Sequence, residues 1–381
     1  MAKNGNRLLY IDNIRLLMII LVVMMHLAVT YSNIGSWFYN DPQELNTPEL
    51  VVFAFFQSFT QGYFMGLLFL IAGYFVPASY DKKGFDKFVK ERLIRLGIPT
   101  LMFMLIITPF ISAVLLGYRG SGGEGFWMAY LKYIISFQFI GRTGPLWFAL
   151  ALLVFSIIYA MFRVIAFPEA GDIDEPFPKT RMIIVLILLI GLCTFLVRIS
   201  WPVGTDIINF QLCYFSQYIA LFAIGIKCRR NNWLEKLSFK RGRKWLIAAL
   251  VPGTVSWAVI MLSGGALNGE FDIFFGGTGW QSAAYAFWES FIGVAMSIGL
   301  ISLFKKKFNK QSKLVRVMSD NAFSVYVFHA PLIIALSLLF VPVTLAPLVK
   351  FAVLVLISIP VCFLFTNFVV RKIPYLRKLL V

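Results

Sequence analysis

The chain has 381 residues, of which 59% are hydrophobic and 14% are charged, a composition that excludes a large soluble domain and is typical of a polytopic membrane protein. A formal net charge of +17 would fit a nucleic-acid-binding protein, but the 35 Lys and Arg residues cluster between the hydrophobic segments. We therefore expect a lipid bilayer, and no nucleic acid, to be the partner of this charge.

The first hydrophobic stretch, residues 7 to 31, carries an Asp, an Arg and a His in a sequence that otherwise predicts a membrane span. On an ideal helix Arg15 and His26 lie within roughly 20° of each other and about 16 Å apart along the axis, and Asp12 lies about 40° from His26. Charged groups in hydrocarbon are costly, so we expect this polar stripe to face the bundle interior. In the simpler alternative Asp12 and Arg15 are headgroup anchors, and His26 hydrogen-bonds a neighbouring helix.

Ten segments are long and apolar enough to span a bilayer, and the first is too long in its hydrophobic part to be a cleaved signal peptide. They cover roughly residues 10 to 32, 51 to 78, 93 to 117, 145 to 166, 182 to 200, 208 to 227, 244 to 263, 281 to 304, 321 to 341 and 344 to 370. If the N-terminus is cytoplasmic, the inner connections and tails hold every Lys and Arg except Arg15, Arg119, Lys132, Arg142, Arg198 and Lys350. The positive-inside rule then places both termini in the cytoplasm.

The predicted fold is therefore an all-α bundle of about ten transmembrane helices that forms a single transmembrane domain over residues 1–381. We expect it to be a multi-pass protein of the inner or plasma membrane. The aromatic run in the outer connection 118–144 is too short to span and is expected to lie on the surface or to re-enter the bundle. The glycine-rich run 275–280 lacks a phosphate-loop ending and is interpreted as a flexible connection.

The second segment carries polar residues in its outer half and glycines below them. Gln57 and Gln61 could line a pocket for a hydroxylated acceptor, whereas Gly62 and Gly66 are expected to let a neighbouring helix approach closely. Both interpretations can hold at once.

Arg92 and Arg95 lie at the cytoplasmic start of the third segment, roughly 60° apart on one helical face. Two guanidinium groups in this arrangement could clamp phosphates, although anchoring by the positive-inside rule also explains them. Gly97 and Pro99 just beyond them predict a bent or loosened helical turn.

Three later segments carry further polar groups within apolar sequence. Glu289 and Arg198 lie at similar depths and could form a structural ion pair. His329, which precedes Pro331 by two residues, is the only other histidine besides His26, and taken alone it could be a packing residue. The sequence has no GxSxG elbow, HExxH pattern, HxxxxD motif or CxxC pair, so an enzyme would use histidine and arginine inside a membrane, and we expect no metal site and no disulfide framework.

Five motifs occur together and in order: IDNIRLLMIILVVMMH, LLFLIAGYFVP, ERLIRLGIP, GPLWFALALLVF and SDNAFSVYVFHAPL. This series resembles the acyltransferase 3 family of integral membrane acyltransferases over nearly the whole chain, and looks most like its glucans biosynthesis protein C branch. The resemblance implies transfer of an acyl group, often acetyl or succinyl, from cytoplasmic acyl-CoA to a carbohydrate hydroxyl at the far side of the membrane. It implies no bound cofactor beyond the acyl-CoA donor, and leaves the oligomeric state open.

The resemblance also assigns roles to residues. His26 matches the family's essential first-helix histidine, Arg15 its companion arginine, and Arg92 with Arg95 its RxxR pair. Gly73 and Tyr74 are assigned to the donor pocket, where Ala72 replaces a serine that is common in the family. Acceptor contacts are expected from Gln57, Gln61, Trp147 and Glu289.

The mechanism expected from both lines of reasoning uses neutral His26 as a general base on the acceptor hydroxyl, oriented by His329 or Asp12. Transfer through an acyl-histidine is an alternative. A different class of function also fits the polar bundle: a transporter or flippase for a glycan or a polyprenyl-linked intermediate. The RxxR pair and the absence of a recognisable inverted repeat favour the enzyme.

Overall fold

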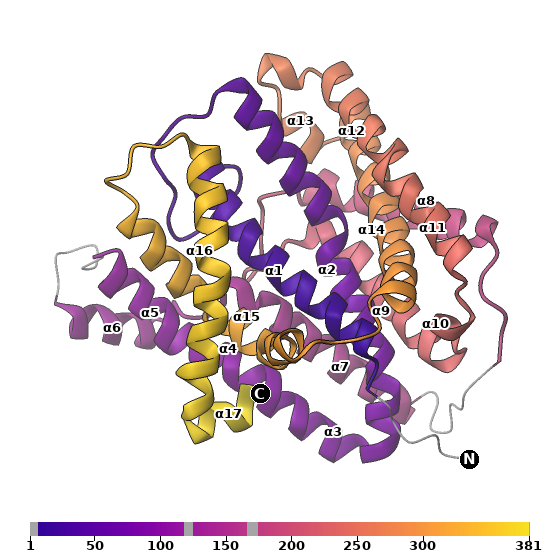
Figure 1. Cartoon of the computed structure of the whole chain (residues 1–381), viewed down its shortest axis with the longest axis horizontal. Helices are drawn as coiled ribbons and strands as arrows, with labels where there is room; N and C mark the ends of the chain where they lie inside the picture. The colour runs from indigo at the N-terminus through magenta and orange to yellow at the C-terminus, as the bar shows by residue number, and fades with distance from the viewer. Residues whose placement is uncertain (1–6, 118–124, 166–173, 381) are drawn as a thin grey trace.

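The computed structural model describes residues 7–117, 125–165 and 174–380, in which every regular element is helical apart from one isolated bridge between Ile207 and Phe210 (Figure 1). Lys3 and Arg119, which were counted in the charge distribution, lie outside this part of the chain. The prediction of an all-α polytopic membrane protein is confirmed.

Nine helices in the described residues are long and apolar enough to cross a membrane. Their bounds are α1 Leu9–Ser32, α2 Thr47–Lys83, the interrupted helix Phe85–Leu115, η4 with α7 Gly144–Ile165, α8 Thr180–Ser200, α11 with α12 Phe239–Ser263, α14 Trp280–Lys307, α15 Lys313–Leu339, and α16 with η7 Pro347–Lys372. Shorter helices are α6 Phe126–Ile135, η5 Leu212–Tyr214, α9 Phe215–Arg230, α10 Trp233–Lys236, η6 Ala266–Asn268, α13 Asp272–Phe275 and α17 Pro374–Leu380. The predicted sixth span corresponds to α9, whose 16 residues reach only about 24 Å.

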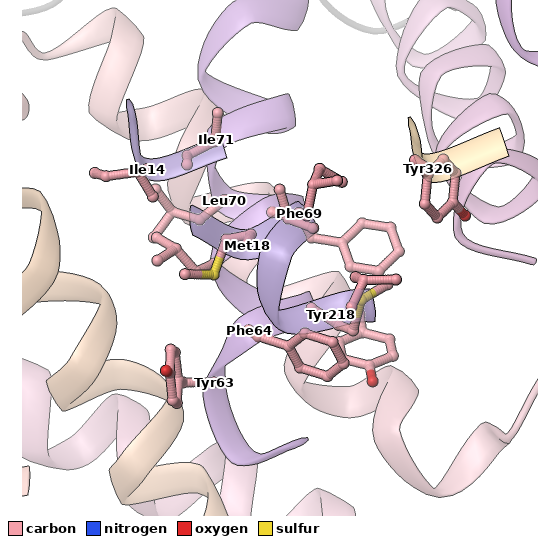
Figure 2. Close-up of a cluster of buried hydrophobic side chains, with 14 of the residues drawn as sticks. Ile14, Met18, Tyr63, Phe64, Phe69, Leu70, Ile71, Tyr218 and Tyr326 are labelled. Atoms are coloured by element: carbon pink, nitrogen blue, oxygen red, sulfur yellow. The ribbon is translucent and has the colours of Figure 1, made fainter. Parts of the chain in front are cut away.

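Helices α1, α2, α14 and α15 form the interior of the bundle, whereas α8, α12 and α16 are mostly exposed on its periphery. Figure 2 shows part of this interior, with Met18 of α1 beside Leu70 of α2 and with Phe69 of α2 against Tyr218 of α9. α1 is thus an inner helix, and Asp12, Arg15 and His26 along it are each partly buried.

Two glycines allow α2 and α9 to pack more extensively than any other pair of elements. A Cβ added to Gly73 would lie 2.1 Å from the carbonyl oxygen of Phe222, and one added to Gly225 would lie 2.1 Å from that of Leu70. Backbone therefore meets backbone at this crossing, the arrangement that small residues permit between membrane helices. Gly73, which the family resemblance assigned to the donor pocket, lies at this helix contact.

The third predicted span is a series of short helices that alternate with π-helical turns. In chain order these are α3 Phe85–Arg92, η1 Leu93–Gly97, α4 Ile98–Met102, η2 Phe103–Ile107, α5 Thr108–Phe110 and η3 Ile111–Leu115, in which η1, η2 and η3 are the π-helical turns. Pro99 and Pro109 cannot donate backbone hydrogen bonds, and a shift of register in the preceding turn accommodates them. The loosened turn predicted from Gly97 and Pro99 is confirmed.

The aromatic run after residue 125 forms α6, which has no buried side chain and lies on the outside of the bundle. Two tyrosine hydroxyls of α6 hydrogen-bond to the backbone of η2. Tyr133 donates to the carbonyl of Met104 at 2.7 Å, and Tyr130 donates to that of Leu105 at 3.1 Å. Of the two predicted arrangements, the structure therefore has the surface one.

Candidate active site

Two histidines that are 303 positions apart in the sequence meet inside the bundle. Nδ1 of His26 lies 3.0 Å from Nε2 of His329, and the ring centroids are 5.0 Å apart. His329 is fully buried, whereas His26 retains partial exposure.

The hydrogen bonds of His329 determine which nitrogens carry protons when both rings are neutral. Nδ1 of His329 lies 2.8 Å from the carbonyl oxygen of Tyr326, which can only accept, so this nitrogen carries the proton. Nε2 of His329 is then an acceptor, and Nδ1 of His26 must donate to it. This assignment from the hydrogen-bond network leaves Nε2 of His26 with a free lone pair, as a general base requires.

Three of the five sequence motifs supply the support around this pair. Tyr326, which holds His329 through its carbonyl, donates its own hydroxyl to the carbonyl of Pro145 in the GPLW motif. The ring of Tyr326 also packs edge-on against Phe148 at 6.3 Å between centroids. The histidine pair is thus fixed where α1, α15 and the start of α7 meet.

Trp37, in the connection between α1 and α2, stacks on His26 with ring centroids 3.9 Å apart and planes inclined by 25°. Sequence analysis did not select this residue, because it lies in a connecting loop with no motif around it. Its position depends on how the loop folds back over the end of α1.

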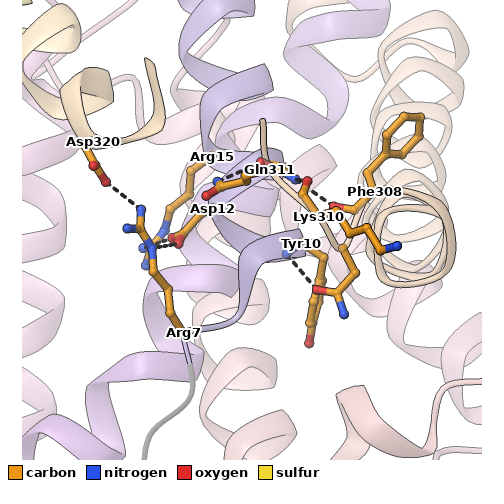
Figure 3. A network of polar contacts seen from close by, with 10 residues as sticks. Arg7, Tyr10, Asp12, Arg15, Phe308, Lys310, Gln311 and Asp320 are labelled. Atoms are coloured by element: carbon orange, nitrogen blue, oxygen red, sulfur yellow. Dashed lines mark hydrogen bonds and ion pairs between the residues drawn. The ribbon is translucent and has the colours of Figure 1, made fainter. Parts of the chain in front are cut away.

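A charge cluster lies at the opposite end of α1 (Figure 3). Asp12 accepts a short hydrogen bond from Arg7 and lies 3.5 Å from Arg15, while Arg7 also contacts Asp320 at 2.7 Å. These hydrogen bonds raise the pKa of the Arg7 guanidinium above its ordinary value. We refer to this end of the bundle, which contains Arg7, Asp12 and Arg15, as the basic side.

Asp12 does not orient His26, because about 21 Å of helix separates the two residues. The suggestion that Asp12 holds the imidazole is therefore wrong, and His329 takes that place. The carboxylate of Asp12 is instead the partner of two arginines.

Arg15, Arg92 and Arg95 are the arginines predicted for the donor side of the site. The guanidinium of Arg15 lies 4.7 Å from the ring centroid of Phe75, and the Arg15 side chain is 40% exposed. The positive charges of Arg15 and Arg95 both act on the guanidinium of Arg92. Arg95 is exposed and belongs to the π-helical turn η1. Three like charges gathered in this way favour an anionic ligand. Tyr74, predicted for the donor pocket, is buried beside Phe75.

The residues predicted for the acceptor fall into separate groups. Gln61 donates to the hydroxyl of Tyr218 at 3.1 Å, and Tyr218 stacks on Trp147 at 5.7 Å, so Gln61 and Trp147 share one neighbour. Gln57 donates to Ser32 at the end of α1 at 2.6 Å and is buried.

Glu289 forms the ion pair that was one of its two expected roles. Its carboxylate lies 2.5 Å from the guanidinium of Arg198, and both side chains are buried. The rings of Tyr214 and Tyr285 lie against the same guanidinium at 5.4 and 5.5 Å. The predicted contact between Glu289 and an acceptor stays a prediction.

An open apolar groove of about 370 Å³ lies between α2 and α12, away from the histidine pair. It is lined by Val51, Val52, Phe55, Phe56, Phe59, Thr60, Thr254, Trp257 and Ala258. Neither Gln57 nor Gln61 lines it.

A histidine pair inside a helical membrane bundle, with a group of arginines on one side, is the arrangement expected of a membrane-embedded enzyme that uses histidine chemistry. A family model described as an acyltransferase domain, acyltransferase 3, matches residues 8–367, and the chain therefore belongs to this family of membrane acyltransferases. Family membership decides against the transporter alternative.

The curated relatives carry one name. The chain is 24% identical over 336 residues to glucans biosynthesis protein C of Salmonella gallinarum, which covers 85% of this chain and 81% of that protein. It is 23% identical, over the same shares, to the proteins of that name from Salmonella paratyphi B and Salmonella enteritidis. No solved structure matches the chain significantly.

Proposed function

We propose that this enzyme is an O-acyltransferase that moves an acyl group of the acetyl or succinyl class from cytoplasmic acyl-CoA to a hydroxyl of a cell-envelope or secreted carbohydrate. The observation that carries the proposal is the contact between His26 and His329, which leaves a basic nitrogen on His26. The carbohydrate acceptor is supported by relatives that are named for glucans biosynthesis.

The donor enters from the basic side, which the distribution of Lys and Arg assigns to the cytoplasm. Arg92 and Arg95 hold the phosphates of CoA, with Arg15 between them and the interior. About 16 Å of helix separates Arg15 from His26, a gap that the extended pantetheine arm would bridge. A passage between the two groups is part of this proposal.

In the reaction, Nε2 of His26 takes the proton from the acceptor hydroxyl while the hydroxyl oxygen attacks the carbonyl carbon of the thioester. The tetrahedral intermediate collapses, the carbon–sulfur bond breaks, and the CoA thiolate takes the proton back from His26. While His26 is an imidazolium, its hydrogen bond to His329 is charge-assisted and therefore stronger than in the resting pair. The products are the acyl ester and free CoA.

An acyl-histidine route uses the same nitrogen as a nucleophile. Nε2 of His26 would attack the thioester, release CoA, and then pass the acyl group to the acceptor oxygen. Rapid quenching without acceptor, followed by peptide mass spectrometry, separates the two routes, because only this one adds the acyl mass to His26.

The proposal is tested by thiol release from acetyl-CoA and succinyl-CoA by the purified protein in lipid nanodiscs, with a carbohydrate acceptor present. We expect His26→Ala to lower the rate by about 10²-fold to 10⁴-fold, the range of general base catalysis. Lys87→Ala, at an exposed residue of α3 to which the proposal gives no role, serves as the control. Full transfer by His26→Ala would remove the mechanism.

A further inference from the structure

The connection between α1 and α2 is fastened at several points to the end of the bundle opposite the basic side. The backbone N–H of Asp41 donates to the carbonyl of Thr30 at 2.8 Å, and the side-chain amide of Asn33 donates to the carbonyl of Asp41 at 2.9 Å. Asn33 adopts a left-handed conformation with φ of 57°, which turns the chain back over the end of α1. The connection is therefore folded onto α1.

A buried ion pair attaches the same connection to α16. Nζ of Lys350 lies 3.0 Å from Oδ2 of Asp41, and the two residues are 1% and 3% exposed. The backbone N–H of Leu348 also donates to the carboxylate of Glu49 at 3.2 Å, at the start of α2. The connection, through Asp41, and the start of α2, through Glu49, are thus both docked against the first turn of α16.

Trp37 lies between Asn33 and Asp41 in the sequence, and its ring is close to those of both histidines. Its ring is 3.9 Å from that of His26 and 6.4 Å from that of His329, and it is nearly parallel to the latter at 15°. Phe38 packs edge-on against the indole at 5.1 Å. The indole N–H is buried without a hydrogen-bond partner among the described residues, so stacking and the fastened backbone hold the ring in place.

We propose that Trp37 is a positioning residue for acyl transfer, which keeps the imidazole of His26 in the orientation that donates to His329, and that the Asp41–Lys350 pair holds Trp37 in this position. The inference rests on the proposed role of His26. A rigid aromatic face restricts rotation of the stacked imidazole, and it also attracts the imidazolium that forms during the reaction. A loop residue thereby contributes to the geometry of the base.

Two variants and a control test the role of Trp37. Trp37→Ala removes the stacking face, Trp37→Phe keeps an aromatic face without the N–H, and Trp127→Ala removes an exposed tryptophan of α6. Each full-length protein is purified by size exclusion in nanodiscs and assayed for kcat and donor KM by thiol release. Modification of His26 by diethyl pyrocarbonate is followed in parallel by peptide mass spectrometry.

For Trp37→Ala we expect His26 to be modified about five-fold faster and kcat to fall at least about ten-fold, with donor KM unchanged, because misplacing a catalytic group lowers the chemical step. Trp37→Phe retains kcat within about three-fold, and Trp127→Ala behaves as the parent protein. If Trp37→Ala has the same kcat as the parent protein, the inference is overturned, whether or not His26 is modified faster. Activity of His26→Ala would instead defeat the proposed function, while the modification rate still reports on the stacking.

The attachment through the ion pair is tested with the double variant Asp41→Asn, Lys350→Met, which leaves no unpaired buried charge. We expect faster modification of His26 and lower kcat, in the same direction as Trp37→Ala and smaller in size. Parental values of both quantities in the folded double variant would show that the ion pair does not hold Trp37.

Discussion

At the scale of single residues, His329 gives the imidazole of His26 its direction. Its Nδ1 is committed to the carbonyl of Tyr326, so its Nε2 must accept from His26. The sequence identified both histidines from their place in apolar segments, but left His329 and Asp12 as rival partners. The helical rise rules out Asp12, but only the structure shows that His329, on a different helix, lies within hydrogen-bonding distance of His26.

Replacing His329 should therefore harm catalysis through the orientation of His26. We expect His329→Ala to lower kcat by about 10-fold to 10²-fold, and His329→Gln to recover part of the loss because its amide oxygen can accept from His26. Thiol release measures both variants. Equal activities of His329→Ala and the parent protein would contradict the assignment of protons.

The pair of Arg198 and Glu289 permits a stability test that is independent of catalysis. Glu289→Gln leaves the fully buried guanidinium without its counter-charge, so we expect a loss of about 3 to 5 kcal/mol. The double variant Arg198→Met, Glu289→Leu should lose much less, because neither charge remains. Thermal unfolding in detergent measures both, and a milder effect in the single variant than in the double would refute the argument.

At the scale of elements, proline and glycine determine where helices break and where they touch. The turn at Gly97 and Pro99 could be predicted because both residues act locally. The close approach of α2 and α9 could not be assigned to particular glycines, because a glycine at a helix contact and one at a ligand site look alike in sequence. The break between α11 and α12 was not predicted, although Pro252 and Gly253 are a local signal of the same kind.

The crossing of α2 and α9 predicts an unequal response to alanine. Gly225→Ala places a methyl 2.1 Å from the backbone oxygen of Leu70, so the helices must separate and we expect a loss of about 1 to 3 kcal/mol. Gly97→Ala meets only a side-chain carbon of Leu153 at 3.7 Å and serves as the control. Thermal unfolding should distinguish the two, and equal midpoints would rule out the tight crossing.

The arginines of α3 and η1 should act on donor binding. Because lysine cannot make a planar bidentate contact with phosphate, we expect the double variant Arg92→Lys, Arg95→Lys to raise donor KM by about ten-fold with a smaller change in kcat. Initial rates at varied acyl-CoA give both constants. A fall in kcat at constant KM would place these residues elsewhere in the reaction.

At the scale of the whole molecule, nine of the ten predicted spans correspond to helices of the described residues that are long enough to cross a membrane, whereas α9, the counterpart of the sixth, is shorter. The distribution of Lys and Arg predicts that α17 is cytoplasmic and the α1–α2 connection is outside. After the native cysteines are replaced, Ser36→Cys should react with an impermeant maleimide in intact cells, and Lys378→Cys only after permeabilisation. The reverse pattern would invert the orientation.

The ion pair between Lys350 and Asp41 could not be predicted from the sequence. Lys350 was one of six basic residues outside the predicted inner connections, and its partner Asp41 was one of several outer acids. Only the assembled bundle brings them together, since 309 positions separate them.

The contacts of α1 have a consequence for biogenesis. Three of its contacts are with residues from 308 onward. His26 contacts His329, and the amide of Asn13 donates to the carbonyls of Phe308 and Lys310. In the connection that follows α1, Asp41 pairs with Lys350. α1 is synthesised first, but His26 and Asn13 gain these hydrogen-bond partners only after the last helices have been synthesised. Ribosome-bound chains that stop short of α15 should hold His26 open to chemical modification, and active enzyme should arise only once synthesis is nearly complete.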